Sequence, residues 1–461
     1  MKKKFRTESD SLGNIKVDNS RFWGAQTQRS IQNFQIGNDK MPNEVIVAFG
    51  LQKKAAALAN MELLKMNKKI GNSIIYACNQ IINLNLINEF PLSIWQTGSG
   101  TQTNMNANEV ISNFAIKKLK GKIGSKKPIH PNDHVNMSQS SNDTFPSIMN
   151  IACNELIEKK LKQSLNKLSN ELKNKSKKYS KIIKVGRTHL QDAIPITLGQ
   201  EFSGYYQQIK NNQKRLINAQ NELKFLAQGG TAVGTGLNAP KNFDKVFCKH
   251  LSKLTKNKYF PSPNKFESIA AHDTMVNLSG LMNTIAVSLL KISNDIRFLG
   301  SGPRAGLCEL ILPANEPGSS IMPGKVNPTQ IEALSMVCLQ IMGNHSSISI
   351  AGSQGHFELN AYKPLILINN IQSINLLSDS INSFVKNCLV GIKPNKINIK
   401  KNLENSLMLV TALNDHIGYD EASKIARKAY KDNITLKEAA KKLNSIDEKK
   451  FDKLVQPKKM I

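Results

Sequence analysis

The chain has 461 residues, a formal net charge of +29 and 40% hydrophobic residues. This length suits one large domain or two to three ordinary ones, and the hydrophobic share excludes wholesale disorder. The positive charge raises the possibility of a nucleic-acid partner. The lysines are spread along the whole chain beside Asn and Ile, however, as an A+T-rich genome would place them, so we expect no specific binding of nucleic acid.

The amino-terminal segment and the cysteines indicate the compartment. Met1–Asp10 carries lysines and acidic residues without the apolar core of a secretory signal, and no apolar run approaches the roughly 20 residues that span a bilayer. The six cysteines are scattered, with no zinc or iron–sulfur spacing. We therefore expect a soluble, cytoplasmic protein that has buried, inert thiols and neither a metal nor a membrane partner.

Residues 1–139 form the first of three predicted domains, a mixed but mainly helical one. The segment "TGSGTQTNMN" (Thr97–Asn106) is a Gly, Ser and Thr loop ahead of a helix that contains Glu109. The following segment "SQSSNDTFP" (Ser138–Pro146) offers hydroxyls and amides ahead of a long helix through Ile157. Taken alone, each loop is typical of ordinary helix capping.

Residues 140–396 are the second predicted domain, a central bundle of long helices. Apolar residues recur there at steps of three and four, which is the pattern of one buried stripe on a long helix. The stripes comprise Ile157, Leu161, Leu165, Leu168 and Leu172; Leu278, Leu281, Ile285, Leu289, Ile292, Ile296 and Leu299; and Ile331, Leu334, Cys338 and Ile341. With few strand-like alternations, the sequence predicts a mainly α fold rather than a Rossmann sheet.

Two glycine-containing segments interrupt the bundle. In "GRTHLQDAIPITLGQ" (Gly186–Gln200), Thr188 and His189 precede a capping box made by Thr197 and Gln200. The stretch "GTGLNA" (residues 234–239) imitates a dinucleotide-binding fingerprint, but no strand leads into it and Pro240 follows directly. We interpret that stretch as a turn.

The segment "GSSIMPGKVNPTQIEA" (Gly318–Ala333) ends a loop at a helix start. Asn327 suits an N-cap, Pro328 the first helical position and Gln330 the third position of a capping box. Glycines expose backbone N–H groups, and Lys325 adds a full charge at the positive end of the helix, so this loop can bind an anion. After "GIKPNK" (residues 391–396), shorter charged helices make up the third predicted domain, residues 397–461.

The four loops together resemble the site segments of one family. All are rich in hydrogen-bond donors, which a ligand with two carboxylates would use. "GSSIMPGKVNP" resembles the signature loop of the fumarase/aspartase superfamily, and "TGSGTQTNMN", "SQSSNDTFP" and "GRTHLQDA" resemble its other site segments in the same order. The resemblance runs from about residue 5 to the end, and "TGSGTQ" with the glycine of "MPGKVNP" is similar to class II fumarases.

The resemblance implies a homotetramer in which the long helices form a twenty-helix core and three subunits share each active site. It also implies reversible hydration of fumarate to (S)-malate in the tricarboxylic acid cycle, without metal or cofactor. Malate would lose a proton from C3 through an aci-carboxylate intermediate and then lose water. Aspartate ammonia-lyase is the alternative enzyme, and a basic, non-enzymatic scaffold that has kept the fold is the alternative of another class.

The resemblance also assigns roles to residues. Ser319 would be the general base, His189 the other acid or base acting through a water, and Glu332 the partner that fixes the tautomer of His189. Lys325 and Asn327 would stabilise the dianion. The remaining substrate-binding residues would be Ser99, Gly100, Thr101, Ser140, Ser141, Asn142, Thr188, Ser320 and Val326.

"IHPNDHVN" resembles the family's second anion site, with His130, Pro131, Asn132 and Asp133 as binding residues. A surface turn explains this segment nearly as well. Composition alone also leaves simpler roles open for the catalytic candidates: a flexible turn at Ser319, a structural histidine at His189, and a complement to the helix dipole at Glu332.

Overall fold

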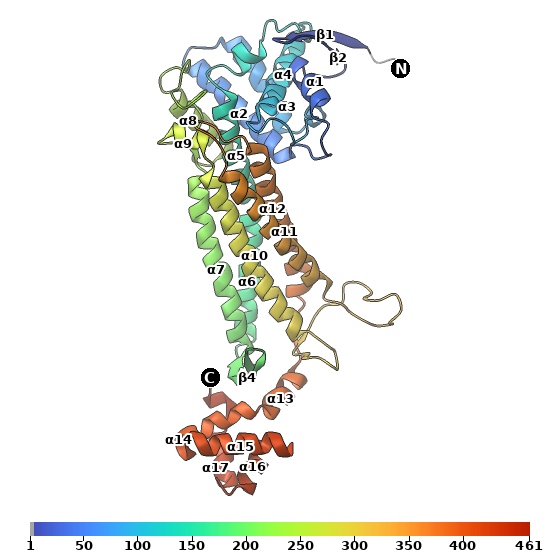
Figure 1. Cartoon of the computed structure of the whole chain (residues 1–461), viewed down its shortest axis with the longest axis vertical. Helices are drawn as coiled ribbons and strands as arrows, with labels where there is room; N and C mark the ends of the chain where they lie inside the picture. The colour runs from blue at the N-terminus through green and yellow to red at the C-terminus, as the bar shows by residue number, and fades with distance from the viewer. Residues whose placement is uncertain (1–3) are drawn as a thin grey trace. The chain divides into compact units, whose positions relative to one another are not determined.

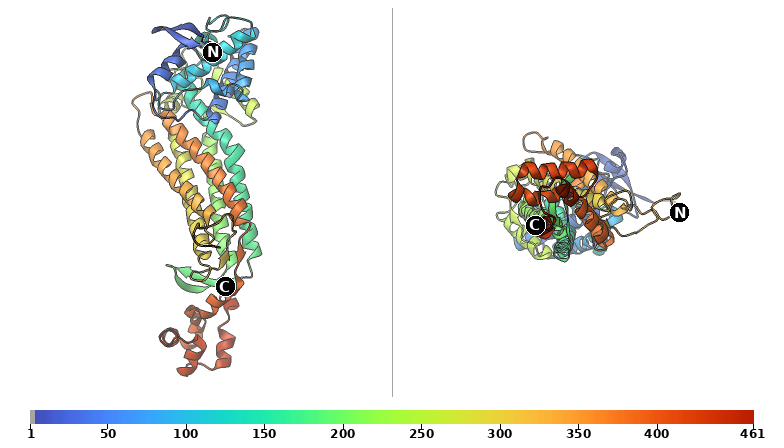
Figure 2. Two further views of the ribbon diagram at one scale, coloured as in Figure 1. Left: turned by 90° about the vertical axis from the view of Figure 1, so that its right-hand side faces the viewer. Right: turned by 90° about the horizontal axis from the view of Figure 1, so that it is seen from below.

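The computed structural model describes residues 4–461, which form two compact units (Figures 1 and 2). The first unit comprises the chain up to Gln163, Lys214–Ala286 and Leu339–Ser378; the second comprises Ser164–Gln213, Val287–Cys338 and Asp379–Ile461. The first three residues of the expected non-secretory segment lie outside the described part. The predicted division at residues 139 and 396 is a different division of the chain and stays a prediction.

The first unit is built mainly from helices that pack on α2. Its sequential elements are β1 (Phe5–Asp10), β2 (Gly13–Asp18), α1 (Ala25–Asn33), α2 (Asn43–Glu62), α3 (Lys68–Ile82), η1 (Ile87–Glu89), α4 (Thr101–Lys118), η2 (Pro131–Val135), α5 (Ser141–Leu156), η3 (Ile157–Leu161), β5 (Phe225–Leu226), α8 (Phe243–Thr255), β6 (Phe260–Pro261) and α9 (Lys265–Ala270). Strands β1 and β2 pair antiparallel, and β5 pairs parallel with β6. Helix α2 contacts α3, α4, α5 and α8, so α4 and α5, which begin in the predicted site loops, share one support.

Five long helices follow, and three of them, together with η3, carry the predicted apolar stripes. The five are α6 (Lys162–Lys178), α7 (Leu198–Glu222), α10 (Asp273–Leu299), α11 (Thr329–Gly352) and α12 (Lys363–Phe384), which η4 (Val385–Leu389) extends. Every residue of the three predicted stripes is buried, which confirms the helical interpretation. Within the second unit, Tyr205 of α7 donates a hydrogen bond to Asp295 of α10 at 2.9 Å, which joins these parts of the two helices.

Helix α10 corrects one expectation from the sequence. By length and composition alone it could cross a membrane, with a mean hydropathy of 1.4 over its most apolar window, so the statement that no apolar run was long enough is wrong. Half of that window is buried inside the protein. A helix that packs against neighbours on several sides is apolar on several sides, which explains this composition without a membrane.

The rest of the second unit contains two antiparallel strand pairs and a cluster of short helices. These elements are β3 (Ile183–Thr188), β4 (Gln191–Thr197), β7 (Leu310–Ile311), β8 (Lys393–Pro394), α13 (Lys396–Asn405), η5 (Leu407–Leu413), α14 (Asn414–Ile417), α15 (Tyr419–Asp432), α16 (Leu436–Lys442), α17 (Glu448–Leu454) and η6 (Pro457–Lys459). The last helices have a core of their own, in which Leu413, Ile425 and Ala439 are fully or almost fully buried. Figure 1 shows α13–α17 gathered in one cluster.

The six cysteines are all buried and free, as expected. Burial raises the pKa of the Cys78, Cys248, Cys338 and Cys388 thiols to about 12, so they stay protonated and unreactive at neutral pH. The stretch at residues 234–239 is a turn, as predicted.

Candidate active site

The loop before α4 presents two hydroxyls at a helix start. Gly100 is the N-cap, in the left-handed region at φ +76°, and a Cβ there would lie 2.2 Å from the Phe145 ring. Only glycine satisfies both conditions. The hydroxyls of Ser99 and Thr101 are hydrogen-bonded to each other at 2.8 Å. Thr101 therefore stands at the amino-terminal end of α4, where the helix dipole favours a negative charge.

The loop before α5 is held by a buried carboxylate. Ser140 and Asp143 form a capping box, and Asp143 also accepts hydrogen bonds from the backbone N–H groups of Gly229 and Thr231, each at 2.9 Å. Burial raises the pKa of Asp143 to about 6. The side chain of Asn142 donates to the carbonyl of Ala232 at 2.8 Å, so the turn is fixed at both ends.

The two loops meet in the first unit. Asn104, one turn into α4, donates to the hydroxyl of Ser141 at 2.8 Å. Segments 97–106 and 138–146 are thus brought together, although more than 30 residues separate them in the chain. A cavity of about 410 Å³ is lined by Thr97, Thr101 and Arg29, among others.

The predicted second anion site is the turn η2. The Nδ1 atom of His130 accepts hydrogen bonds from the N–H groups of Asn132 and Asp133, each at 3.2 Å, and so caps the turn that begins with Pro131. Asn132 and Asp133 are exposed. The geometry accounts for this segment as a well-formed surface turn, and a role in binding an anion stays a prediction.

Thr188 and His189 lie at the exposed tip of the β3–β4 hairpin. His189 and Leu190 form its two-residue loop, at φ +55° and +60°. Such turns prefer Asn-Gly, because bulky residues with positive φ are strained by about 1–3 kcal/mol each. His189 also lines a cavity of about 830 Å³ with Arg187, Tyr205 and Asp295. An exposed histidine held in a strained conformation is typical of a functional site.

Buried charges lie beneath the hairpin. Glu309, which is fully buried, accepts a hydrogen bond from Arg187 at 2.5 Å and lies 3.2 Å from the Nζ atom of Lys184. Lys184 is also bonded to Glu201 at 3.0 Å. This network fixes the strand that ends at Thr188.

The signature loop is closed on itself. The N–H group of Gly318 donates to the carbonyl of Lys325 at 2.9 Å, and the side chain of Asn327 donates to the carbonyl of Gly318 at 2.6 Å. The Ser319 hydroxyl oxygen accepts hydrogen bonds from the N–H groups of Met322 and Ile321, at 2.9 and 3.2 Å. These are the kind of contacts that would stabilise a serine alkoxide.

Other members of the loop face solvent, and one sequence prediction fails here. Ser320, Lys325 and Val326 are exposed. Helix α11 begins at Thr329, and the side chain of Asn327 does not cap it, because it donates to the loop instead. Gln330 does not complete a capping box either, since its Oε1 atom accepts a hydrogen bond from Ser383 at 2.6 Å. The side-chain amide of Asn327, predicted from the sequence to cap the helix, therefore closes the loop instead.

Glu332 lies in the first turn of α11, half-exposed, with its Oε1 atom 3.9 Å from Arg297. No hydrogen bond joins it to His189 within one chain. Ser99–Thr101, His130–Asp133 and Ser140–Asn142 belong to the first unit, whereas Thr188, His189, Ser319–Asn327 and Glu332 belong to the second.

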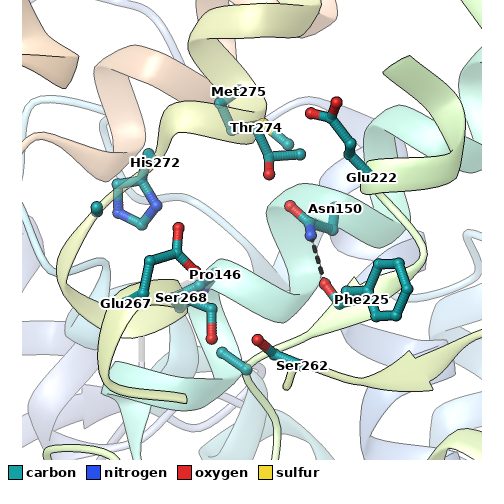
Figure 3. Close-up of a pocket in the computed structure, with 12 residues that line it drawn as sticks. Pro146, Asn150, Glu222, Phe225, Ser262, Glu267, Ser268, His272, Thr274 and Met275 are labelled. Carbon is teal, nitrogen blue, oxygen red and sulfur yellow. Dashed lines mark hydrogen bonds between the residues drawn. The ribbon is translucent and has the colours of Figure 1, made fainter. Parts of the chain in front are cut away.

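A further pocket, in the first unit, contains none of the predicted residues (Figure 3). It has a volume of about 50 Å³, room for a few water molecules, and is lined by Asn150, Glu222, Glu267 and His272, among others. Burial lowers the pKa of His272 to about 3, so this histidine is neutral. The Asn150 side chain donates to the carbonyl of Phe225 at 2.8 Å, as Figure 3 shows.

Sequence reasoning missed the amides and the lysine beneath the first two loops. Lys53, in α2, is fully buried and donates to Asn136 and Gln139 at 2.9 and 3.0 Å. Burial lowers the pKa of Lys53 to about 7. Its position in an alanine-rich helix was the only signal, whereas Asn104 lay within a quoted motif and was given no role.

Comparison with known proteins agrees with this geometry. Residues 13–343 match a family described as lyase, and residues 409–461 match the family "Fumarase C C-terminus". The chain is 58% identical to "Fumarate hydratase class II" of Rickettsia conorii, over 100% of this chain and 99% of the relative, and 55% identical to "Fumarate hydratase, mitochondrial" of Saccharomyces cerevisiae, over 100% and 95%. The crystal structure of the class II fumarase from Schistosoma mansoni superposes with a TM-score of 0.97, at 46% identity and 99% coverage of both chains. The chain therefore belongs to the class II fumarate hydratases of the fumarase/aspartase superfamily.

Proposed function

We propose that this protein catalyses the reversible hydration of fumarate to (S)-malate in the tricarboxylic acid cycle. The observation that carries the proposal is full-length similarity to relatives named fumarate hydratase, at 58% identity for the Rickettsia conorii protein. The hydroxyl, amide and lysine donors of the predicted loops suit a substrate with two carboxylates.

Removing a proton from C3 of malate places two negative charges on the neighbouring carboxylate. Preorganised donors aimed at that group can each lower the barrier by about 3–4 kcal/mol. We assign this role to Lys325 and Asn327. Ser319 removes the proton, and its support is local: two backbone N–H groups already point at its oxygen. These N–H groups stabilise the charge that the oxygen carries before it takes the proton.

His189 then acts as the acid toward the departing hydroxyl, through a water molecule. An imidazole has one nitrogen that can donate a proton and one that can accept it, as this step requires. Its exposure at a strained hairpin tip supports this role. We propose that Glu332 from another copy of the chain orients the ring, since within one chain its charged neighbour is Arg297.

The substrate carboxylates are held by hydroxyl and amide groups. We assign this role to Ser99, Gly100, Thr101, Ser140, Ser141, Asn142, Thr188, Ser320 and Val326. His130, Pro131, Asn132 and Asp133 remain a proposed second anion site.

We propose a homotetramer in which the long helices form a twenty-helix core and three subunits share each active site. The surface of the long helices supports association, because Val287, Phe298, Met336, Leu339 and Ile350 are all at least half exposed. Apolar side chains concentrated on such helices favour burial against further copies. We propose a cytoplasmic location for the enzyme.

The test is an assay of purified protein with malate and with aspartate, each followed by the ultraviolet absorbance of fumarate. We expect fumarate from malate only. Fumarate from aspartate alone would replace this proposal with the ammonia-lyase. Absence of both activities together with steeply salt-dependent binding to duplex DNA would favour the non-enzymatic basic scaffold.

A further inference from the structure

Lys53 lies at one end of a chain of buried hydrogen bonds, in which the Asn136 amide also donates to the backbone carbonyl of Gln139 at 3.2 Å. The Lys53 ammonium group can only donate, so the amides of Asn136 and Gln139 must turn their oxygens toward it. Helices α2, α4 and α5, which surround this group, contact one another and lie together in Figure 1. A lysine contact of this kind assigns an amide orientation that geometry alone often leaves ambiguous.

The orientation passes from Asn136 to Asn104. The Oδ1 atom of Asn136 also accepts hydrogen bonds from the side-chain amides of Asn104 and Asn108, each at 3.2 Å. Asn104 must therefore present its NH₂ group to Asn136, and the same NH₂ group donates to Ser141 at 2.8 Å. It keeps this orientation although its buried Oδ1 atom has no hydrogen-bond partner among residues 4–461.

The consequence concerns the single proton of the Ser141 hydroxyl. Because the oxygen accepts from Asn104 on its inner side, the proton is free to point outward. A carboxylate can only accept hydrogen bonds, so an outward proton is what a bound dicarboxylate requires. With the opposite polarity, Ser141 would donate inward and turn its lone pairs toward the negative charge.

We propose that Lys53 is a positioning residue that, through Asn136 and Asn104, keeps the Ser141 hydroxyl as a donor to a substrate carboxylate. The inference rests on the proposed function, in which Ser141 binds that carboxylate. Lys53 touches no reacting atom in this account. A hydrogen bond to a carboxylate contributes about 1.5–3 kcal/mol, or roughly 10- to 100-fold in affinity.

The decisive variant is Asn104→Asp, whose carboxylate cannot donate and so reverses the polarity. We expect it to raise the KM for malate at least tenfold with kcat changed less than threefold, because the lost contact is made in both the ground and transition states. The matched control is Asn108→Asp, which places the same charge one turn further along α4, against the same Asn136 oxygen but not at Ser141. Its KM should change less than threefold.

Two further measurements make the result specific. Lys53→Met should raise the KM for malate as Asn104→Asp does. In a Ser141→Ala background, Asn104→Asp should raise KM little further, since the two substitutions remove the same contact. Equal KM changes in Asn104→Asp and Asn108→Asp, or additive effects of Asn104→Asp and Ser141→Ala, would overturn the inference. An unchanged KM in Lys53→Met would overturn the role of Lys53; if that variant fails to fold, Asn136→Leu, which removes the link from Lys53 to Asn104, replaces it in the test. Lack of malate turnover by the wild type would overturn the proposed function as well, which separates the two failures.

Discussion

The network beneath the hairpin that carries His189 predicts a measurable loss of local stability. Glu309→Gln removes the charge that Arg187 and Lys184 share and keeps the size of the side chain. Removing one partner from a buried ion pair costs about 3–5 kcal/mol. Lys184 retains Glu201 at 3.0 Å, and Arg187 is partly exposed, so we expect the lower end, about 3 kcal/mol.

Amide hydrogen exchange of β3 and β4, at a fixed protein concentration, measures this effect without requiring two-state unfolding of an oligomer. A change of 3 kcal/mol corresponds to protection factors about 100-fold lower. The control is Glu448→Gln, which breaks an exposed ion pair with Lys441 (2.7 Å apart) and should change protection in its own helix by less than about 1 kcal/mol. Protection of the hairpin within twofold of wild type would refute the reasoning.

The same network gives a sign for the pH dependence. Burial raises the pKa of Glu309, but the hydrogen bond from Arg187 and the charges of Lys184 and Arg187 outweigh it, so the pKa lies below its ordinary 4.5. The stabilisation is therefore fully present above about pH 4.5 and is lost as the pH falls through the lowered value. Under acidic conditions, protection of the wild-type hairpin should approach that of Glu309→Gln.

Two other predictions concern catalysis and charge burial. Ser319→Ala and His189→Asn should each lower kcat by about 100- to 10,000-fold, with an unchanged sedimentation coefficient, and full activity would remove that residue from its role. The pKa of Lys53 falls from 10.5 to about 7 on burial, so the unfolded chain binds the additional proton between these values and stability should rise with pH across that window. Thermal unfolding at fixed protein concentration should show a flatter rise of stability with pH in Lys53→Met, and a slope equal to that of the wild type would contradict the assignment. The titratable groups that act on Lys53 are Asp143 and the Cys78 thiol.

Periodicity predicted the long helices well because burial along one side of a helix leaves a direct trace in the sequence. Leu278–Leu299 and Ile331–Ile341 are buried at the expected steps, and the capping box of Thr197 and Gln200 is present in both directions. The β3–β4 hairpin left no such trace. His189 and Leu190 occupy a turn that normally selects Asn-Gly, so the local residue types did not indicate a hairpin.

The predicted site residues were recognisable because each lies where a loop ends at a helix or a hairpin, and such positions favour distinctive residue types. The residue type at such a position does not determine the group to which its side chain donates a hydrogen bond. Asn327 has the residue type of a cap, yet it donates to Gly318, because loop closure requires a donor facing that carbonyl. Asn104 likewise has two possible orientations, and the one it adopts matches the Asn136 oxygen, which faces a lysine on another helix. Hydrogen-bond polarity is thus set by contacts between distant segments, which explains why motifs located the carboxylate-binding groups while the buried lysine that orients one of them was missed.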